Sequence, residues 1–271
     1  MTIFSLLGAL ALAAVICIGA PAAGRAEVAV DLELVLAVDV SGSVDPEEAR
    51  LQRDGYVQAF VDPRVIEAIR SGYLGRIAVV YFEWAGFGYN TIVVDWTLIG
   101  GADDARAFSA ALADKPIVTA RRTSISEALQ FAQPLFDANG FTARRRVIDI
   151  SGDGANNHGR LVTLSRDEAV LAGITINGLP IVNDRPSRFG RPPMPDLDLY
   201  YRDCVIGGRS AFLVVADTFT DFARAIRRKL ILEIAGRTPG RPVSPVRRVA
   251  ARRSPPCDAG ERRWQGFIDD F

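Results

Sequence analysis

The sequence predicts an α/β fold: a doubly wound, mainly parallel six-stranded sheet with one antiparallel edge strand and helices on both faces. Three observations support this prediction. Short apolar runs of strand length alternate with segments of helical periodicity, which is typical of a parallel sheet with helices on both sides. The first run, Leu32–Val38, is apolar at nearly every position, as expected for a strand buried on both faces. Polar loops follow two of these runs, and ligands bind at such strand ends.

The first 26 residues are expected to be a signal peptide rather than part of the fold. Residues 3–20 are almost wholly apolar and carry no charge, and small residues follow them, as around a cleavage site. Because about 18 apolar residues can just span a bilayer, a retained membrane anchor is the alternative. A cleaved signal would make the protein exported, either periplasmic or extracellular.

A helix is expected directly after the first strand and its loop. Asp45 is suited to the N-cap, Pro46 to the first helical position, and Glu48 to closing a capping box. Apolar residues recur behind this start at helical spacing, and Asp62-Pro63 is expected to end the helix.

The remaining elements complete the alternation. Strands are expected at Arg76–Phe82 and Thr91–Leu98, and the glycine-containing link between them is short enough for an antiparallel hairpin. Further strands are expected at 146–150, 174–179 and 211–215. Further helices are expected at 103–113, 124–139, 163–172 and 219–234, with a short helix or loop near 200–205.

Residues 27–236 therefore form the expected domain, and residues 237–271 break the pattern. Between Gly236 and Pro256 the chain has six arginines and five prolines but no acidic residue. Such a segment is expected to be a disordered tail, either a solvated linker or a contact with an anionic envelope surface. Cys204 and Cys257 could form a disulfide in an oxidising compartment, or remain two independent thiols.

The loop after the first strand, Asp39-Val40-Ser41-Gly42-Ser43, is the strongest candidate for a binding site. One carboxylate and two hydroxyls at alternate positions, on a loop turned by Gly42, can converge on one point. Oxygen donors suit a hard cation such as Mg²⁺ rather than Zn²⁺. Helix capping is the alternative role for Asp and Ser at such a position.

This motif resembles the metal-ion-dependent adhesion site of von Willebrand factor A and integrin inserted domains. In that family a Thr at the start of a later helix and an Asp after the fourth strand complete the site, and Thr123 and Asp153 stand at those places. The resemblance implies the Rossmann-like von Willebrand factor A fold and one cation, Mg²⁺ or else Mn²⁺ or Ca²⁺. It also implies Ser41 and Ser43 as direct ligands, Asp39, Thr123 and Asp153 as direct or water-mediated ligands, and one position left for an acidic group of a partner.

The resemblance can be narrowed to a more specific family by three later segments, 175–181, 200–208 and 228–236. They are similar to a bacterial family of exported von Willebrand factor A-like proteins catalogued as a domain of unknown function. One departure from the wider pattern is the pair Arg121 and Arg122, where many relatives carry glycines. Guanidinium groups that point at the cation would lower its affinity, and groups that point outward could steer an acidic partner.

Three other side chains are weaker candidates. His158, the one histidine, could act as an acid or base or be a solvated loop residue. Glu83 and Asp95 stand near the expected ends of strands and could support the site from outside the ligand shell.

The leading hypothesis is a non-catalytic module, not an enzyme, that binds a protein partner presenting Asp or Glu. The formal net charge of +0 gives no reason to expect nucleic acid as a partner. A second hypothesis is a hydrolase with a metal-activated water, although the chain has no Gly-x-Ser-x-Gly motif and one histidine. A third is a structural envelope protein whose metal site no longer binds a cation and whose basic tail is the functional part.

Overall fold

The computed structural model describes residues 26–182, 192–218, 221–237 and 252–269. The expected signal peptide, apart from Ala26, lies outside these ranges, and so does residue stretch 238–251 of the tail. Within the described ranges, no helix combines the length and the apolar character that crossing a membrane requires.

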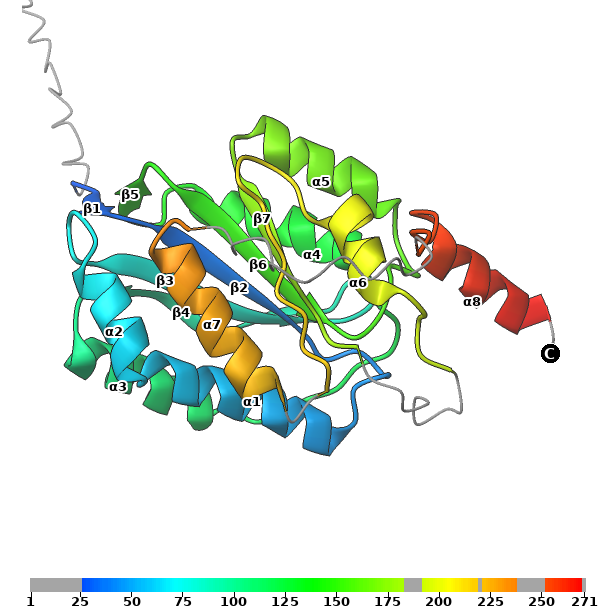
Figure 1. Cartoon of the computed structure of the whole chain (residues 1–271), viewed down its shortest axis with the longest axis horizontal. Coiled ribbons are helices and arrows are strands. Elements are labelled where there is room, and N and C mark those ends of the chain that lie inside the picture. Colours follow the sequence, from blue (N-terminus) through cyan, green and yellow to red (C-terminus); the bar gives the residue numbers. More distant parts are fainter. Residues whose placement is uncertain (1–25, 183–191, 219–220, 238–251, 270–271) are drawn as a thin grey trace, which may run out of the picture.

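The central sheet has five strands, in the order β4 (Asn90–Ile99), β3 (Ile77–Trp84), β2 (Glu33–Asp39), β6 (Arg146–Gly152) and β7 (Thr175–Pro180) (Figure 1). All neighbouring pairs are parallel except β3 and β4, which pair antiparallel at one edge. A separate parallel pair joins β1 (Val28–Val30) to β5 (Phe141–Ala143). The prediction of a mainly parallel sheet with one antiparallel edge strand is confirmed.

The sixth expected strand, residues 211–215, is not a regular strand. The segment lies along the outer edge of β7, where the Val214 N–H donates to the Gly178 carbonyl and the Ala216 N–H donates to the Pro180 carbonyl. A continuous parallel ladder would also need an N–H at position 180, and proline has none. Two isolated parallel bridges therefore remain on either side of Pro180. The prediction of six strands is wrong by this one strand.

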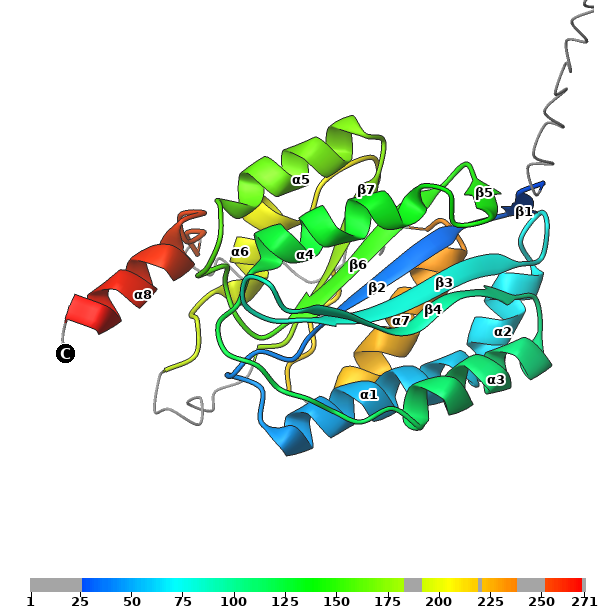
Figure 2. The same ribbon diagram turned by 180° about the vertical axis from the view of Figure 1, so that it is seen from behind.

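Helices lie on both faces of the sheet, so the doubly wound arrangement is confirmed (Figures 1 and 2). One face carries α1 (Pro46–Phe60), α2 (Pro63–Arg70), α3 (Ala102–Ala113) and α7 (Phe222–Ile234). The other carries α4 (Ile125–Ala132), which continues as a 3-10 turn (Gln133–Phe136), α5 (Val162–Leu171), and α6 (Leu197–Tyr200), which continues as a π-helical turn (Tyr201–Val205).

Each strand supplies both apolar cores, because successive side chains point to opposite faces of a sheet. Leu34, Leu36 and Val38 of β2 join the core beneath α1 and α7, while Val35 and Ala37 join the core beneath α4 and α5. Every residue of β2 is buried. This double burial explains why the first predicted strand reads as a continuous apolar run rather than an alternating one.

The predicted start of α1 is confirmed. A second helix, which was not predicted, begins directly after its end. The Asp45 side chain accepts hydrogen bonds from the N–H groups of Glu47 and Glu48, and the Glu48 side chain accepts one from the Asp45 N–H. Asp62-Pro63 ends α1 but also begins α2, with Asp62 as the N-cap that accepts from the Arg64 N–H. Asp-Pro can serve both purposes, and only the first was predicted from the sequence.

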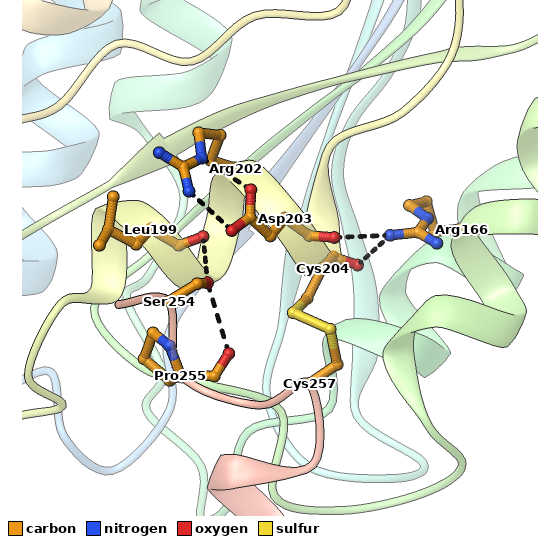
Figure 3. A network of polar contacts seen from close by, with 8 residues as sticks. All are labelled: Arg166, Leu199, Arg202, Asp203, Cys204, Ser254, Pro255 and Cys257. Atoms are coloured by element: carbon orange, nitrogen blue, oxygen red, sulfur yellow. Dashed lines mark hydrogen bonds and ion pairs between the residues drawn. A yellow bond between two sulfur atoms is a disulfide. The ribbon is translucent and has the colours of Figure 1, made fainter. Parts of the chain in front are cut away.

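The tail prediction needs correction for the part that the structure describes. Residues 259–269 form α8 (Ala259–Asp269), and Cys257 forms a disulfide with Cys204, so the two are not independent thiols (Figure 3). Arg252 is ion-paired with Asp196 and Asp198 of the same chain. Disorder was predicted from composition alone, and composition does not reveal a covalent cross-link. The Cys204–Cys257 disulfide holds this segment against the domain.

A charged cluster lies buried between α7 and the sheet. Lys229 Nζ lies 2.5 Å from Asp149 Oδ1 and 2.6 Å from Glu233 Oε1, and all three side chains are at most 1% exposed. Asn177 of β7 donates to Glu233 Oε1 at 2.8 Å and accepts from the Phe212 N–H. Two carboxylates thus share one ammonium group, which connects α7 to β6 and β7.

This cluster predicts a pH dependence of stability. Burial, and then the negative charge of Glu233, raise the pKa of Asp149 to about 8, against about 3.9 in an unfolded chain. The folded state therefore holds one more proton between these values, and the free energy of unfolding should fall as pH rises through that window. The slope from one proton is at most about 1.4 kcal/mol per pH unit.

The Asp149→Asn variant removes this titrating group and should flatten the profile. Urea unfolding of both proteins between pH 5 and pH 8 measures the effect. Asp95→Asn, a change at an exposed carboxyl on β4, is the matched control and should keep the wild-type slope. Parallel profiles for wild type and Asp149→Asn would contradict the prediction.

Candidate metal centre

Three loops meet at the carboxyl ends of β2 and β6. The loop after β2 carries Ser41 and Ser43, and Asp39 ends the strand itself. The loop before α4 carries Thr123, and the loop after β6 carries Asp153. Because β2 and β6 are neighbouring parallel strands, with Val38 opposite Ser151, their following loops emerge side by side.

Hydrogen bonds connect all five predicted residues. Asp39 Oδ1 accepts from the Ser41 N–H at 2.7 Å, and the Ser41 and Ser43 hydroxyls share a hydrogen bond of 3.1 Å. Ser43 Oγ donates to Asp153 Oδ1 at 2.6 Å, and Thr123 Oγ1 donates to Ser41 Oγ at 3.3 Å. The structure therefore brings the five together, and cation binding by them stays a prediction.

The donor set fits a hard cation. All five side chains offer oxygen, and Asp39 Oδ2 is a buried carboxylate oxygen without a hydrogen-bond partner among the described residues. Burying a carboxylate oxygen costs folding free energy unless a cation or a hydrogen-bond donor pairs with it. No cluster of three or more His, Cys, Asp or Glu side chains suited to a metal occurs in the described ranges, but this site has a different make-up, with two carboxylates and three hydroxyls. Hard cations accept such ligands.

The pKa values of the two site carboxyls, Asp39 and Asp153, are both raised by burial and by neighbouring negative charge. Burial, and next the negative charge of Asp153, raise the pKa of Asp39 well above its usual range. Burial raises the pKa of Asp153 to about 6, and the charge of Glu48 acts in the same direction. A cation would offset this repulsion and favour both ionised forms.

Gly152 lets the third loop come close to Asp39. A Cβ at this position would lie 2.8 Å from both Asp39 Oδ2 and Tyr201 Oη. Tyr201 Oη is buried and has no hydrogen-bond partner among the described residues. Burial, and then the charge of Asp39, raise the pKa of Tyr201, so its hydroxyl stays protonated. Tyr201 was not predicted from the sequence, because no spacing relates it to the motif.

Asn157 joins the loop of Thr123 to the loop of Asp153. Its N–H donates to the Thr123 carbonyl at 2.9 Å, and its side-chain Oδ1 accepts from the Thr123 N–H at 3.0 Å. Thr123 is therefore held against the loop of Asp153 by two bonds.

Arg122 has a left-handed backbone, with φ of 70°. Glycine adopts this conformation at no steric cost, whereas an arginine rarely does. The Arg122 guanidinium lies 3.7 Å from the centre of the Trp264 ring in α8 and donates to the Asn157 carbonyl at 3.0 Å. It is thus directed at α8 and the third loop.

The weaker candidates have structural partners. His158 Nδ1 accepts from the Phe87 N–H at 3.0 Å, and burial together with the charge of Arg122 lowers the pKa of His158. Glu83 is ion-paired with Arg53. Asp95 is exposed and accepts from the neighbouring Trp96 N–H.

Comparison with known proteins identifies the family. Residues 29–238 match the family described as "Protein of unknown function (DUF1194)". The chain belongs to the DUF1194 family. The match ends before Cys257, so α8 and its disulfide tether lie outside the DUF1194 domain. No protein of curated function matches the sequence.

Solved structures that resemble this DUF1194 protein include a von Willebrand factor type A protein, which confirms the predicted fold. A von Willebrand factor type A protein of Catenulispora acidiphila has 14% identity and a TM-score of 0.50, over 76% of this chain and 43% of that one. The pilus adhesin SpaC of Lactobacillus rhamnosus GG has 15% identity and a TM-score of 0.54, over 76% and 30%.

A third similar structure is proximal thread matrix protein 1 of the mussel byssus, solved with a zinc-occupied MIDAS motif. It has 12% identity and a TM-score of 0.52, over 76% of this chain and 46% of that one. The DUF1194 chain thus spans less than half of each of these three proteins. At these identities the similarity establishes the fold.

Proposed function

We propose that this protein is an exported, non-catalytic module that binds an acidic side chain of a protein partner through one divalent cation. The observation that carries the proposal is the convergence of five oxygen-bearing side chains from three loops at one edge of the sheet. Asp39, Ser41, Ser43, Thr123 and Asp153 would hold the ion. Three of the five ligands are neutral hydroxyls, so this shell offsets less of the ion's charge than a carboxylate-rich shell would, and the ion can accept a further carboxylate from the partner.

Two features support export and an intact site. The Cys204–Cys257 disulfide suits an oxidising compartment such as the periplasm or the outside of a cell. All five residues of the motif are joined by hydrogen bonds, which supports an intact site rather than a lapsed one. The histidine near the site, His158, accepts from the Phe87 N–H through Nδ1, so that nitrogen is not free to act as the base of a hydrolase.

Mg²⁺ is the expected ion, with Mn²⁺ or Ca²⁺ as alternatives, since hydroxyl and carboxylate oxygens are hard ligands. The mussel protein carries zinc in its MIDAS motif, so Zn²⁺ belongs in any comparison of ions. The side chains of this protein would bind the ion and orient a partner carboxylate, and no bond need be broken.

Capture of partners from envelope extracts tests the proposal. Immobilised wild-type protein should retain a partner in Mg²⁺ and release it with chelator, and added Mg²⁺ should restore capture. Asp153→Asn should retain none, because one of the two site carboxylates is lost. Asp95→Asn, at an exposed position on β4, should behave as wild type.

The acidic nature of the partner group can be tested in the same assay. Converting the carboxyls of the extract to amides before capture should abolish retention, while blocking its amines should leave retention unchanged. Capture that is indifferent to both chelation and Asp153→Asn would refute the proposed function.

A further inference from the structure

Helix α8 begins beside the loops that carry the candidate ligands. Figures 1 and 2 both show the start of α8, coloured red, next to the loop that leads from β6 into α5. This loop contains Asp153. Contacts from α8 and its disulfide tether reach all three parts of the site by separate routes.

The first route reaches the loop of Asp153. Asn156 is fully buried, and its Nδ2 donates to Glu261 Oε1 of α8 at 2.7 Å, while its Oδ1 accepts from the Ser126 N–H of α4 at 2.9 Å. Gly260 of α8 packs so closely that an added Cβ would lie 1.9 Å from the Asn156 carbonyl oxygen. The helix therefore rests directly on the backbone three residues after Asp153.

The second route reaches the loop of Thr123. The Trp264 ring of α8 lies against the Arg122 guanidinium, at 3.7 Å from its centre. Arg122 in turn donates to the Asn157 carbonyl, and Asn157 holds Thr123 by two hydrogen bonds. Arg122 directly precedes the candidate ligand Thr123 in the sequence, and its contact with Trp264 connects the loop of Thr123 to α8.

The third route runs through the disulfide to Asp39. Cys204 lies in the π-helical turn Tyr201–Val205, and its carbonyl and that of Asp203 accept from Arg166 of α5 (Figure 3). The same turn carries Tyr201, whose hydroxyl lies beside Asp39 and Gly152. The bond between Cys204 and Cys257 thus fastens α8 to the turn that packs against Asp39.

We infer that the C-terminal segment 252–269 is a positioning part of the cation site, and that cation affinity depends on the docking of α8 onto the site loops. The inference rests on the proposed function, and it adds a segment that lies outside the family match. The physical reason is preorganisation. Groups that support metal ligands from outside keep the donor oxygens at the spacing the ion requires, so the ion does not have to order them on binding.

Two glycines of α8 offer a matched test. Gly260→Ala puts a methyl group onto the Asn156 carbonyl, whereas Gly266→Ala meets no atom within 4 Å. Both changes replace a helical glycine by alanine, and they differ in this contact. In calorimetric titration with Mn²⁺, Gly260→Ala should bind about tenfold more weakly than wild type, and Gly266→Ala should bind like wild type.

Two further variants approach the same docking contact independently. Trp264→Ala removes the ring beneath Arg122, and the double variant Cys204→Ser/Cys257→Ser removes the tether. Each should weaken Mn²⁺ binding in the same direction, by about tenfold. If Gly260→Ala fails to fold, as judged by circular dichroism, these variants carry the test.

The outcomes separate the two proposals. Wild-type protein that binds no Mn²⁺, Mg²⁺, Ca²⁺ or Zn²⁺ would overturn the cation site, and this inference with it. Wild-type binding together with unchanged affinity in the folded Gly260→Ala, Trp264→Ala and double serine variants would overturn the positioning role alone. Weaker binding in Gly260→Ala with normal binding in Gly266→Ala would support it.

Discussion

Replacing Asp39 with asparagine should abolish cation binding while leaving the fold intact. The carboxylate of Asp39 is fully buried, and one of its oxygens has no hydrogen-bond partner among the described residues. Asparagine keeps the shape and an Oδ1 that can accept from the Ser41 N–H, but it removes the charge. Loss of outer supporting groups alone weakens metal sites 10- to 100-fold, so loss of a ligand should exceed about a hundredfold.

The same variant should be at least as stable as wild type when no cation is added. Burial and the charge of Asp153 raise the pKa of Asp39, so ionised Asp39 opposes folding above the unfolded pKa of about 3.9. Removing that charge relieves the opposition at pH 7. The free energy of unfolding should therefore stay the same or rise while cation affinity falls. This pattern distinguishes loss of the site from loss of the fold.

Calorimetry with Mn²⁺ and urea unfolding in chelator measure the two quantities. Asp95→Asn is the control for both, because it neutralises an exposed carboxyl far along β4. An Asp39→Asn protein that binds Mn²⁺ with wild-type affinity would exclude this carboxylate as a ligand.

Replacing Lys229 with methionine should cause the largest loss of stability. Lys229 Nζ is the shared partner of Asp149 and Glu233, and all three side chains lie in the core between α7 and the sheet. Methionine matches the length of the side chain but leaves two buried carboxyls without their cation. Breaking a buried ion pair in this way typically costs about 3–5 kcal/mol.

This loss should depend on pH in a defined direction. Without the ammonium group nothing positive offsets the charge of buried Asp149, so the already raised pKa of Asp149 rises further. The variant should therefore lose more stability at pH 8 than at pH 5. Urea unfolding at both values measures this, and Lys115→Met, at an exposed lysine, should change little. A pH-independent loss below about 1 kcal/mol would show that the cluster contributes little.

The sequence was most informative where a structure follows from local pattern. Strand β2 was predicted because both of its faces are buried, and burial on both faces leaves an unbroken apolar run. The start of α1 was predicted because a capping box involves residues only three positions apart. Asp39, Ser41 and Ser43 were found as a motif that follows a buried strand, at the edge of a parallel sheet where ligands bind. Thr123 and Asp153 were found through the resemblance to the adhesion-site family.

Tertiary structure decided the features that depend on residues distant in the chain. Strand 211–215 was lost because Pro180, in its neighbour, lacks the N–H that the ladder needs. Lys229 and Glu233 resemble the charged face of any surface helix, and only the packing of α7 on the sheet buries them.

By itself, then, the amino-acid sequence determined the layers of the fold and the set of side chains at the candidate site. The three-dimensional arrangement decided that Tyr201 packs against Asp39, that Cys204 meets Cys257, and that α8 rests on the site loops. The physical reason is that periodicity and capping act over a few residues, whereas these contacts arise from the packing of elements about 50 to 160 residues apart in the chain.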